Sequence, residues 1–348
     1  MIRKLTLLFA LPLTACQSGP ATDPNDVLET IGSIERIDPA LDALVPADAR
    51  IEVIANGYTW SEGPVWIDED GGYLLFSDIP PNRVWKWASG QGASLYLAQS
   101  GYLDPIPRPE HIAPDEPGSN GLLLDPEGRL VLCQHGLRQV GRMKAPLSAP
   151  EPDYEPLATH WDGKRLNSPN DATFRSDGSL YFTDPPYGMT RKMQDPHKEI
   201  DFQGVYRRAP DGGVQLLTRE MSRPNGIAFS PDEKTLYVAN SDPKRAVWMA
   251  FPVLDDGTLG AGRVFFDATP MVGRLPGLPD GLKVDQHGNL FATGPGGVLV
   301  FAPDGRHLGT LLTGRPTSNC AFGDDGRTLY VTANGELVRI RLTTKGAR

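Results

Sequence analysis

The chain has 348 residues, of which 39% are hydrophobic and 22% are charged, so it is long enough for one large domain or two ordinary ones. Its 38 glycines and 33 prolines are spread along the whole length, which indicates many turns rather than a disordered tail. The net charge is −9 and no basic run follows the first few residues, which excludes a nucleic-acid partner and favours a small molecule or a cation.

The first residues are typical of a secretory signal peptide. The stretch MIRKLTLLFALPLTAC has a basic start, an apolar run too short to span a bilayer, and small residues before Cys16. Its last four residues, LTAC, resemble a bacterial lipobox, in which the cysteine is lipidated; an ordinary cleaved signal is the alternative. We therefore predict a signal over 1–15, and a lipidated Cys16 with a tether over 16–50. Because Gln17 rather than aspartate follows the cysteine, we expect an anchor in the outer membrane, facing the periplasm.

One pattern then recurs six times: a polar residue, a short apolar strand, a turn rich in Asp, Gly or Pro, and a second strand. The copies are EGPVWIDEDGGYLLFSD, NGLLLDPEGRLVLCQH, NDATFRSDGSLYFTD, NGIAFSPDEKTLYVANS, DGLKVDQHGNLFATG and NCAFGDDGRTLYVTAN, and their first residues are 58, 50, 55, 55 and 39 positions apart. Two more strand candidates follow most copies. Units of four short strands predict an all-β fold, a six-bladed β-propeller with four-stranded antiparallel blades, over 51–348. Seven blades or a sandwich is the alternative, but there is no seventh copy.

The first strand of each propeller blade lines the central channel, so the first residues of the six copies should form a ring at one channel mouth. These six residues, all with side-chain oxygens, are Glu62, Asn120, Asn170, Asn225, Asp280 and Asn319. Asn-Gly and Asp-Gly are also hairpin-turn signals. Each copy, however, has its own hairpin turn a few residues later, so a second turn signal is not needed for chain reversal. The pattern therefore favours a ring of oxygens around a metal-binding channel.

Carboxylate and amide oxygens without histidine or cysteine favour one hard divalent cation, foremost Ca²⁺, with Mg²⁺ or Mn²⁺ as alternatives. Two of the ring residues, Glu62 and Asp280, would offset its charge. There is no HExxH, HxH or CxxC spacing to support a conventional zinc site, and Zn²⁺ is the last alternative. PGSNG misses the GxSxG pattern by one glycine and precedes a strand, which disfavours a serine hydrolase.

The second strand of each copy returns to the same face, so its end should also border the channel. The residues at those ends are Asp78, His135, Asp184 and Asn240, with Tyr187 just beyond in TDPPYG. A histidine here is as often a hydrogen-bonded structural residue as a catalyst. The long connections 101–119 and 187–203 could cover the channel mouth or be plain surface loops.

These segments resemble the gluconolactonase, senescence-marker-protein and luciferin-regenerating enzyme family of six-bladed propeller lactonases. The likeness runs from SIERIDPALDALVP to the C-terminus and is strongest in EGPVW, GKRLNSPND, YFTDPPYG, PNGIAFSPDEKTLYVA, PDGLKVD and NCAFGDDGRTLYVT. The resemblance implies one catalytic divalent cation with four ligands, namely Glu62, Asn170, Asn225 and Asp280. Asn170 is expected to act on it directly or through a water.

The resemblance also suggests how the substrate is bound. Animal members place a substrate-binding arginine two residues before the third-blade asparagine, where this chain has Ser168, so a sugar-acid lactone preference does not follow. Asn120 and His135, in SNGLLLD and CQHG, look like the bacterial gluconolactonase branch. Together with Tyr187 and Asn319 they are expected to contact the substrate.

The reaction implied by the resemblance is metal-dependent hydrolysis of a gluconolactone-like lactone or related cyclic ester to the hydroxy acid. Asp280 is the first candidate for the general base; Asp184 and His135 are the alternatives, since a nearby cation would lower the pKa of Asp280. An organophosphate or other ester hydrolase on the same metal site is a rival prediction. So is a non-catalytic, ligand-binding propeller lipoprotein, with or without a merely structural cation. No protein partner is implied.

Overall fold

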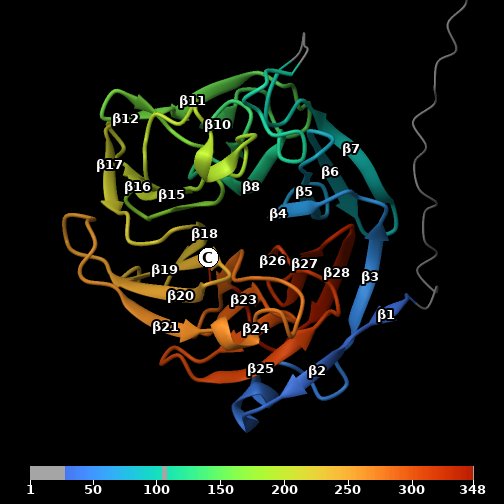
Figure 1. Cartoon of the computed structure of the whole chain (residues 1–348). Coiled ribbons are helices and arrows are strands. Elements are labelled where there is room, and N and C mark those ends of the chain that lie inside the picture. Colours follow the sequence, from blue (N-terminus) through green and yellow to red (C-terminus); the bar gives the residue numbers. More distant parts are fainter. Residues whose placement is uncertain (1–27, 104–107, 348) are drawn as a thin grey trace, which may run out of the picture.

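The computed structural model describes residues 28–103 and 108–347, in which six antiparallel β-sheets are arranged like blades around a central axis (Figure 1). A seventh, two-stranded sheet pairs β12 (His160–Trp161) with β13 (Lys164–Arg165). This confirms the prediction of a six-bladed β-propeller. The predicted signal over 1–15, Cys16 and the first part of the tether lie outside the described residues and stay predictions. Among the described residues, no helix is long and apolar enough to cross a membrane.

Four blades consist of consecutive strands, and within each blade the first strand is innermost. Blade one contains β4 (Ser61–Ile67), β5 (Tyr73–Asp78), β6 (Arg83–Ala88) and β7 (Gly92–Ala98). Blade two contains β8 (Ser119–Leu124), β9 (Leu130–Gln134), β10 (Gln139–Met143) and β11 (Tyr154–Ala158). Blade three contains β14 (Ala172–Phe174), β15 (Leu180–Asp184), β16 (Gly204–Arg208) and β17 (Val214–Thr218). Blade four contains β18 (Pro224–Phe229), β19 (Thr235–Asp242), β20 (Arg245–Pro252) and β21 (Arg263–Asp267).

The last two blades incorporate strands from the start of the chain. Blade five contains β22 (Leu282–Val284), β23 (Leu290–Gly294), β24 (Gly297–Phe301) and β25 (His307–Leu312), and β2 (Ser33–Arg36) joins its outer edge. Blade six contains β26 (Asn319–Gly323), β27 (Thr328–Ala333) and β28 (Glu336–Arg341), followed by β3 (Ile51–Asn56) and β1 (Thr30–Ile31). Because β3 pairs with β28, the ring is closed by segments from opposite ends of the chain.

Residues 28–50 correct the prediction of a tether that reaches to residue 50. The 3-10 helix η1 (Pro39–Ala43) and the residues after it bring Leu41, Leu44 and Val45 into the hydrophobic core formed with blades five and six. Burying apolar side chains there stabilises this segment against the propeller. The prolines and polar residues suggested a linker, but the apolar residues between them decide the structure.

The core of the propeller lies between neighbouring blades. The second strand of blade one, YLLFSD, is buried at every position, as are the second strands LYFTD and LFATG of blades three and five. Both faces of such a strand are covered, which explains why these strands read as continuous apolar runs instead of alternating ones. Across one blade boundary, Trp248 of β20 packs against Phe301 of β24 with ring centroids 5.3 Å apart.

The Asn-Gly and Asp-Gly pairs at the inner strands are not hairpin turns. In blades one, two and four the strand register shifts at this point, so the first two strands pair through a β-bulge that re-aims the side chains. The glycines allow the next blade to approach: a Cβ on Gly63 would lie 2.1 Å from the Asn120 carbonyl oxygen, and one on Gly226 would lie 2.3 Å from that of Asp280.

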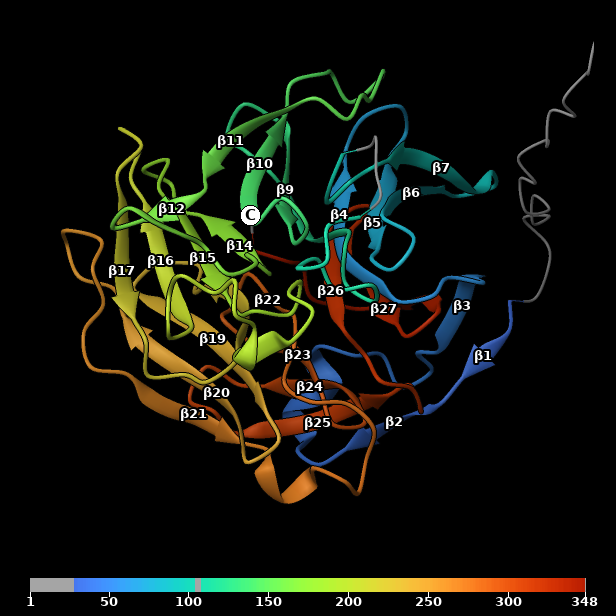
Figure 2. The same ribbon diagram turned by 45° about the horizontal axis from the view of Figure 1, so that its top comes forward.

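The C-terminal end returns to the axis, as Figures 1 and 2 show from two directions. The Ala347 amide donates to the Val284 carbonyl oxygen at 2.9 Å, and Gly346 forms a bridge with Asp285 beside the first strand of blade five. One end of the channel therefore has the C-terminal segment beside it. The ring of predicted site residues lies at the opposite ends of the inner strands, where β4, β8 and β18 begin.

Candidate metal centre and active site

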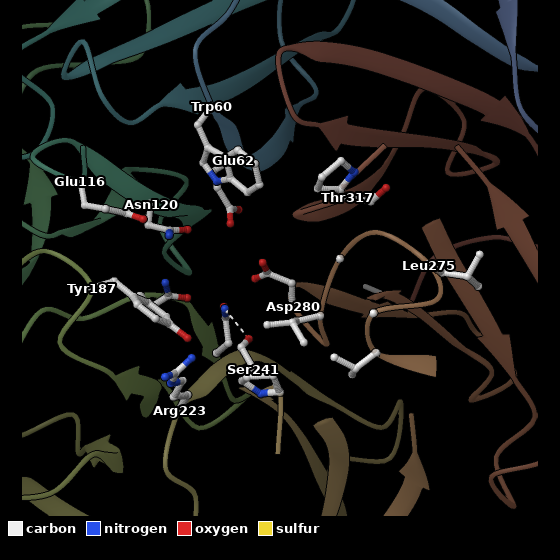
Figure 3. A pocket seen from close by; sticks show the side chains of 18 residues that line it. Trp60, Glu62, Glu116, Asn120, Tyr187, Arg223, Ser241, Leu275, Asp280 and Thr317 are labelled. Atoms are coloured by element: carbon white, nitrogen blue, oxygen red, sulfur yellow. Dashed lines mark hydrogen bonds between the residues drawn. The ribbon is translucent and has the colours of Figure 1, made fainter. Parts of the chain in front are cut away.

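A cavity of about 480 Å³ lies at the channel mouth where the inner strands begin. Five of the six predicted ring residues line it: Glu62, Asn120, Asn170, Asn225 and Asp280. Figure 3 shows the carboxylates of Glu62 and Asp280 pointing into the same space from different blades. Residues more than 200 positions apart in the chain thus converge on one site, as the repeat pattern predicted.

The oxygens around this space fit a divalent cation. Oδ1 of Asn120, Asn170 and Asp280 is buried, and none of the three has a hydrogen-bond partner among the described residues. Buried polar oxygens without partners are rare, because their desolvation is costly. Burial raises the pKa of Glu62 to about 8, with further contributions from neighbouring carboxylates. Burial, followed by the charge of Glu62, raises the pKa of Asp280 well above its usual range.

A bound cation would supply the positive charge needed to offset the two carboxylates when they are ionised. Residues 28–103 and 108–347 contain no group of three or more His, Cys, Asp or Glu side chains that could hold a metal. Any ion here would therefore depend on amide oxygens in addition to the two carboxylates, which is the donor set of a hard cation rather than of a conventional zinc site.

The expected ligands of blades four and five are positioned by hydrogen bonds. Asn225 Nδ2 donates to Ser241 Oγ at 2.9 Å, which leaves Oδ1 as the free end of the amide. Ser241 Oγ in turn donates to the carbonyl oxygen of Pro279, the residue before Asp280. The Asp280 amide donates to the Thr293 carbonyl oxygen at 2.9 Å. One serine thus links two expected metal ligands on neighbouring blades.

In blade one, the Gly63 amide donates to Oε2 of Glu62 at 2.8 Å and restrains that carboxylate. In blade three, the Asn170 amide donates to the Thr183 carbonyl oxygen at 2.9 Å. The main chain around each ligand is therefore held before any ion binds, which reduces the entropic cost of forming the site.

His135 does not line the cavity. Its side chain is fully buried, and its Nδ1 lies 3.2 Å from Oε2 of Glu116, which does line the cavity. Part of the 187–203 connection covers the histidine, because a Cβ on Gly188 would lie 2.5 Å from the His135 Cβ. His135 thus lies behind Glu116 and outside the cavity lining, which differs from the predicted direct contact with the substrate.

Asp78, Asp184 and Asn240 share one structural role. Each lies at or near the end of the second strand of its blade and accepts a hydrogen bond from the loop that leads into the first strand. Asp78 Oδ1 accepts from the Thr59 and Trp60 amides, both at 3.0 Å. Asp184 Oδ2 accepts from the Asn167 amide, and Asn240 Oδ1 from the Arg223 amide, each at 2.8 Å.

Asp184 does not line the cavity. It is fully buried, and its burial raises its pKa to about 7. A general base must reach the proton that it removes, so this placement argues against Asp184 as the alternative base. Its structural role, by contrast, requires only the bond to the Asn167 amide.

Of the predicted substrate contacts, Asn120 and Tyr187 line the cavity and Asn319 does not. The Asn319 side chain accepts the Cys320 amide at 2.8 Å and also interacts with the carboxylates of Glu62 and Asp171. It thus lies against the cavity floor. Burial raises the pKa of the Tyr187 phenol above its usual range, so this side chain is a neutral hydrogen-bond donor.

Four polar residues of the cavity were not singled out from the sequence: Glu116, Arg223, Ser241 and Thr317. Glu116 belongs to the long connection before blade two. Arg223 lies two residues before Asn225, the position that Ser168 holds before Asn170 in blade three. Comparing the residue two positions before the ring residue in every blade would have identified Arg223 from the sequence. Apolar residues of the loop before Asp280, including Val272, Leu275 and Leu278, complete the wall.

Comparisons with known proteins agree with this arrangement. A family model described as "SMP-30/Gluconolactonase/LRE-like region" matches residues 60–335. The gluconolactonase of Zymomonas mobilis is 41% identical over 352 residues, which cover 97% of this chain and 95% of that protein. The structure of XC5397 from Xanthomonas campestris, described as a gluconolactonase, is 33% identical with a TM-score of 0.77 and covers 94% of this chain and 100% of that one. A calcium-binding regucalcin from Agrobacterium tumefaciens shares the fold at 20% identity with a TM-score of 0.61, covering 85% of this chain and 94% of that one.

Proposed function

This chain belongs to the SMP-30/gluconolactonase/LRE-like family, and from that membership we propose that it hydrolyses a gluconolactone-like lactone to the corresponding hydroxy acid. One structural observation carries the proposal: carboxylate and amide oxygens from separate blades converge on one cavity, where the buried Glu62 and the half-buried Asp280 point into the same space. A surface that only binds another macromolecule has no need of such a costly arrangement.

We propose that Glu62, Asn170, Asn225 and Asp280 hold one divalent cation, foremost Ca²⁺, with Mg²⁺, Mn²⁺ or Zn²⁺ as alternatives. When bound, the cation would polarise the ester carbonyl and stabilise the negative charge that develops on its oxygen. The buried oxygens that have no partner among the described residues support this assignment.

Asp280 is the proposed general base. Its Oδ1 is buried and receives no hydrogen bond from any described residue, so it can accept a proton from a water molecule. Burial raises its pKa, and a nearby positive charge would bring that pKa back toward the range useful for a base at neutral pH. The water oxygen then bonds to the carbonyl carbon, the ring C–O bond breaks, and the ring oxygen takes up a proton as the new hydroxyl.

The other cavity residues would bind and orient the substrate. Tyr187 brings a hydrogen-bond donor to the wall, and Asn120 brings an amide beside Glu62 (Figure 3). Glu116, with His135 behind it, is the second candidate for moving a proton. The apolar wall around Leu275 and Leu278 would exclude water from the face of the bound ring.

The test is acid release from glucono-1,5-lactone, followed with a pH indicator and corrected for spontaneous hydrolysis. We expect turnover that is lost in chelator and restored by added Ca²⁺, Mg²⁺ or Mn²⁺. Asp280→Asn should lower kcat by about 100-fold or more, whereas the exposed carboxylate variant Asp153→Asn should match the wild type. Full turnover by Asp280→Asn with the cation bound would refute the base assignment.

Two rival functions give different results in the same experiment. An organophosphate hydrolase would turn over a phosphotriester panel faster than the lactone panel, and a ligand-binding protein would release no acid above the spontaneous rate with any cation. If the cation is merely structural, Asn225→Ala should lower the melting temperature and leave the activity of the folded protein unchanged.

A further inference from the structure

Arg223 is the only cationic side chain among the described residues that line the cavity. Its main chain is held on both sides: the Arg223 amide donates to Asn240 Oδ1 at 2.8 Å, and its carbonyl oxygen accepts the Ser241 amide at 2.9 Å. In blade three the equivalent residue is Ser168, whose hydroxyl donates to the Pro185 carbonyl oxygen at 2.7 Å and does not line the cavity. Two residues before the ring asparagine, blade four therefore has a positively charged side chain that lines the cavity, whereas blade three has a neutral one that does not.

No carboxylate of the described residues forms an ion pair with this guanidinium. Asp242 is close enough for its pKa to be lowered by Arg223, but both of its oxygens are engaged elsewhere. Its Oδ2 accepts the Ser222 hydroxyl at 2.6 Å, and its Oδ1 accepts the Lys244 amide at 2.9 Å. A guanidinium that is partly removed from water without an anionic partner is costly, so its placement is best explained by a ligand.

The cavity is electrostatically divided. Glu62, Asp280 and Glu116 bring carboxylates to the part suited to a cation, whereas Arg223 and the Tyr187 phenol lie together on another part of the wall (Figure 3). Burial and then the charge of Asp280 raise the pKa of the Tyr187 phenol, and Arg223 acts in the opposite direction, so the phenol lies between the two charged parts of the wall. Guanidinium groups bind carboxylate, phosphate and sulfonate oxygens through paired N–H donors, and a phenol adds a further donor.

We propose that Arg223 binds an acidic group of the substrate, so that the preferred substrates are lactones that carry a carboxylate, phosphate or sulfonate in addition to the ring ester. This inference rests on the proposed lactonase function. A cavity of about 480 Å³ is in the range that encloses small ligands, and it leaves room for a six-carbon lactone with such a group. The ring ester would face the carboxylates and amides of the proposed metal site, and the acidic group would face Arg223.

Steady-state kinetics on matched substrates test the proposal: glucono-1,5-lactone, a glucarolactone and 6-phosphogluconolactone. We expect the wild type to have a kcat/KM for the acidic lactones at least about tenfold above that for the neutral one, through a lower KM. Arg223→Gln should lower kcat/KM on the acidic lactones by about 10- to 100-fold and on the neutral lactone by less than about threefold. Arg223→Lys should fall between, because it keeps the charge and loses the paired donors.

Arg274→Gln is the matched control, because Arg274 is exposed and lies in the loop 272–278 beside the cavity without lining it. It should leave all three kcat/KM values unchanged, which separates direct contact from general attraction of anions. The proposal is wrong if the wild type prefers the neutral lactone, or if Arg223→Gln slows all three substrates equally.

A binding measurement distinguishes this inference from the proposed function. Calorimetric titration of inorganic phosphate into chelator-treated wild type and Arg223→Gln should give at least about tenfold weaker binding to the variant. If no lactone is hydrolysed, the proposed function fails, while the titration still decides whether Arg223 binds an anion. If the neutral lactone is hydrolysed but neither kinetics nor titration depends on Arg223, the function stands and this inference is refuted.

Discussion

Replacing Glu62 with glutamine should separate two effects of the Glu62 and Asp280 carboxylates: their mutual repulsion without a cation, and their binding of a cation when one is present. Glu62 is buried and Asp280 is half-buried, and their carboxylates face the same space; burial, followed by the charge of Glu62, raises the pKa of Asp280, so ionising both carboxylates together is costly. Without a cation, Glu62→Gln should therefore melt at a higher temperature than the wild type, because the repulsion is removed. With a cation, the order should reverse, because the variant has lost a charged ligand.

The magnitude follows from ligand linkage. A cation at 100 times its Kd stabilises the folded state by about 2.7 kcal/mol. For about 320 folded residues the entropy of unfolding is about 0.7 kcal/mol per kelvin, so the melting temperature of the wild type should rise by about 4 °C. If the variant binds about 100-fold more weakly, the same concentration adds only about 0.4 kcal/mol, which is less than about 1 °C.

Calorimetry of protein treated with chelator and then titrated with Ca²⁺, Mg²⁺ or Mn²⁺ would measure both shifts. Glu69→Gln, at an exposed carboxylate away from the cavity, should respond to cations like the wild type. Two results would refute the reasoning: a Glu62→Gln variant with the full wild-type shift, or one that melts lower than the wild type in chelator.

Three further variants test how the site is built. Ser241→Ala removes the acceptor of Asn225 Nδ2 and should lower kcat by about tenfold with little change in melting temperature. A melting temperature that falls together with kcat would indicate a folding defect instead. Because burial raises the pKa of Asp184 to about 7, this carboxyl should lower the stability of the wild type progressively as pH rises from about 4 to 7, since only the unfolded state releases its proton there. Asp184→Asn removes this contribution and keeps those of the other raised carboxyls, so urea unfolding should give a free-energy difference in favour of the variant that grows across this window by up to about 1.4 kcal/mol per pH unit; a pH-independent difference would contradict the assignment. Gly226→Ala places a Cβ 2.3 Å from the Asp280 carbonyl oxygen and should destabilise the fold by about 1–3 kcal/mol in thermal melts, whereas an unchanged melting temperature would show that the blades can separate.

The repeat pattern of the chain predicts the propeller and most of the residues of its ring. The inner strands of every blade are consecutive in the chain and joined by short turns, so their pattern is written in one stretch of chain and repeats six times. The channel-lining position follows from the same pattern, which is why Glu62, Asn120, Asn170, Asn225 and Asp280 could be predicted together. Asn319 has the same place in the pattern, yet it does not line the cavity; its side chain accepts the Cys320 amide and interacts with Glu62 and Asp171.

Which other groups reach the cavity depends on contacts between segments that are distant in the chain. Glu116 and Arg223 come from loops whose paths depend on packing against other blades, and His135 is covered by a connection about 50 residues further along the chain. Pairing of β3 with β28, and of β2 with β25, likewise joins segments that no local pattern relates. The pattern of apolar residues along a strand shows which of its side chains point into the core. The path of a loop depends instead on contacts between residues that are distant in sequence, and a single sequence does not display those contacts.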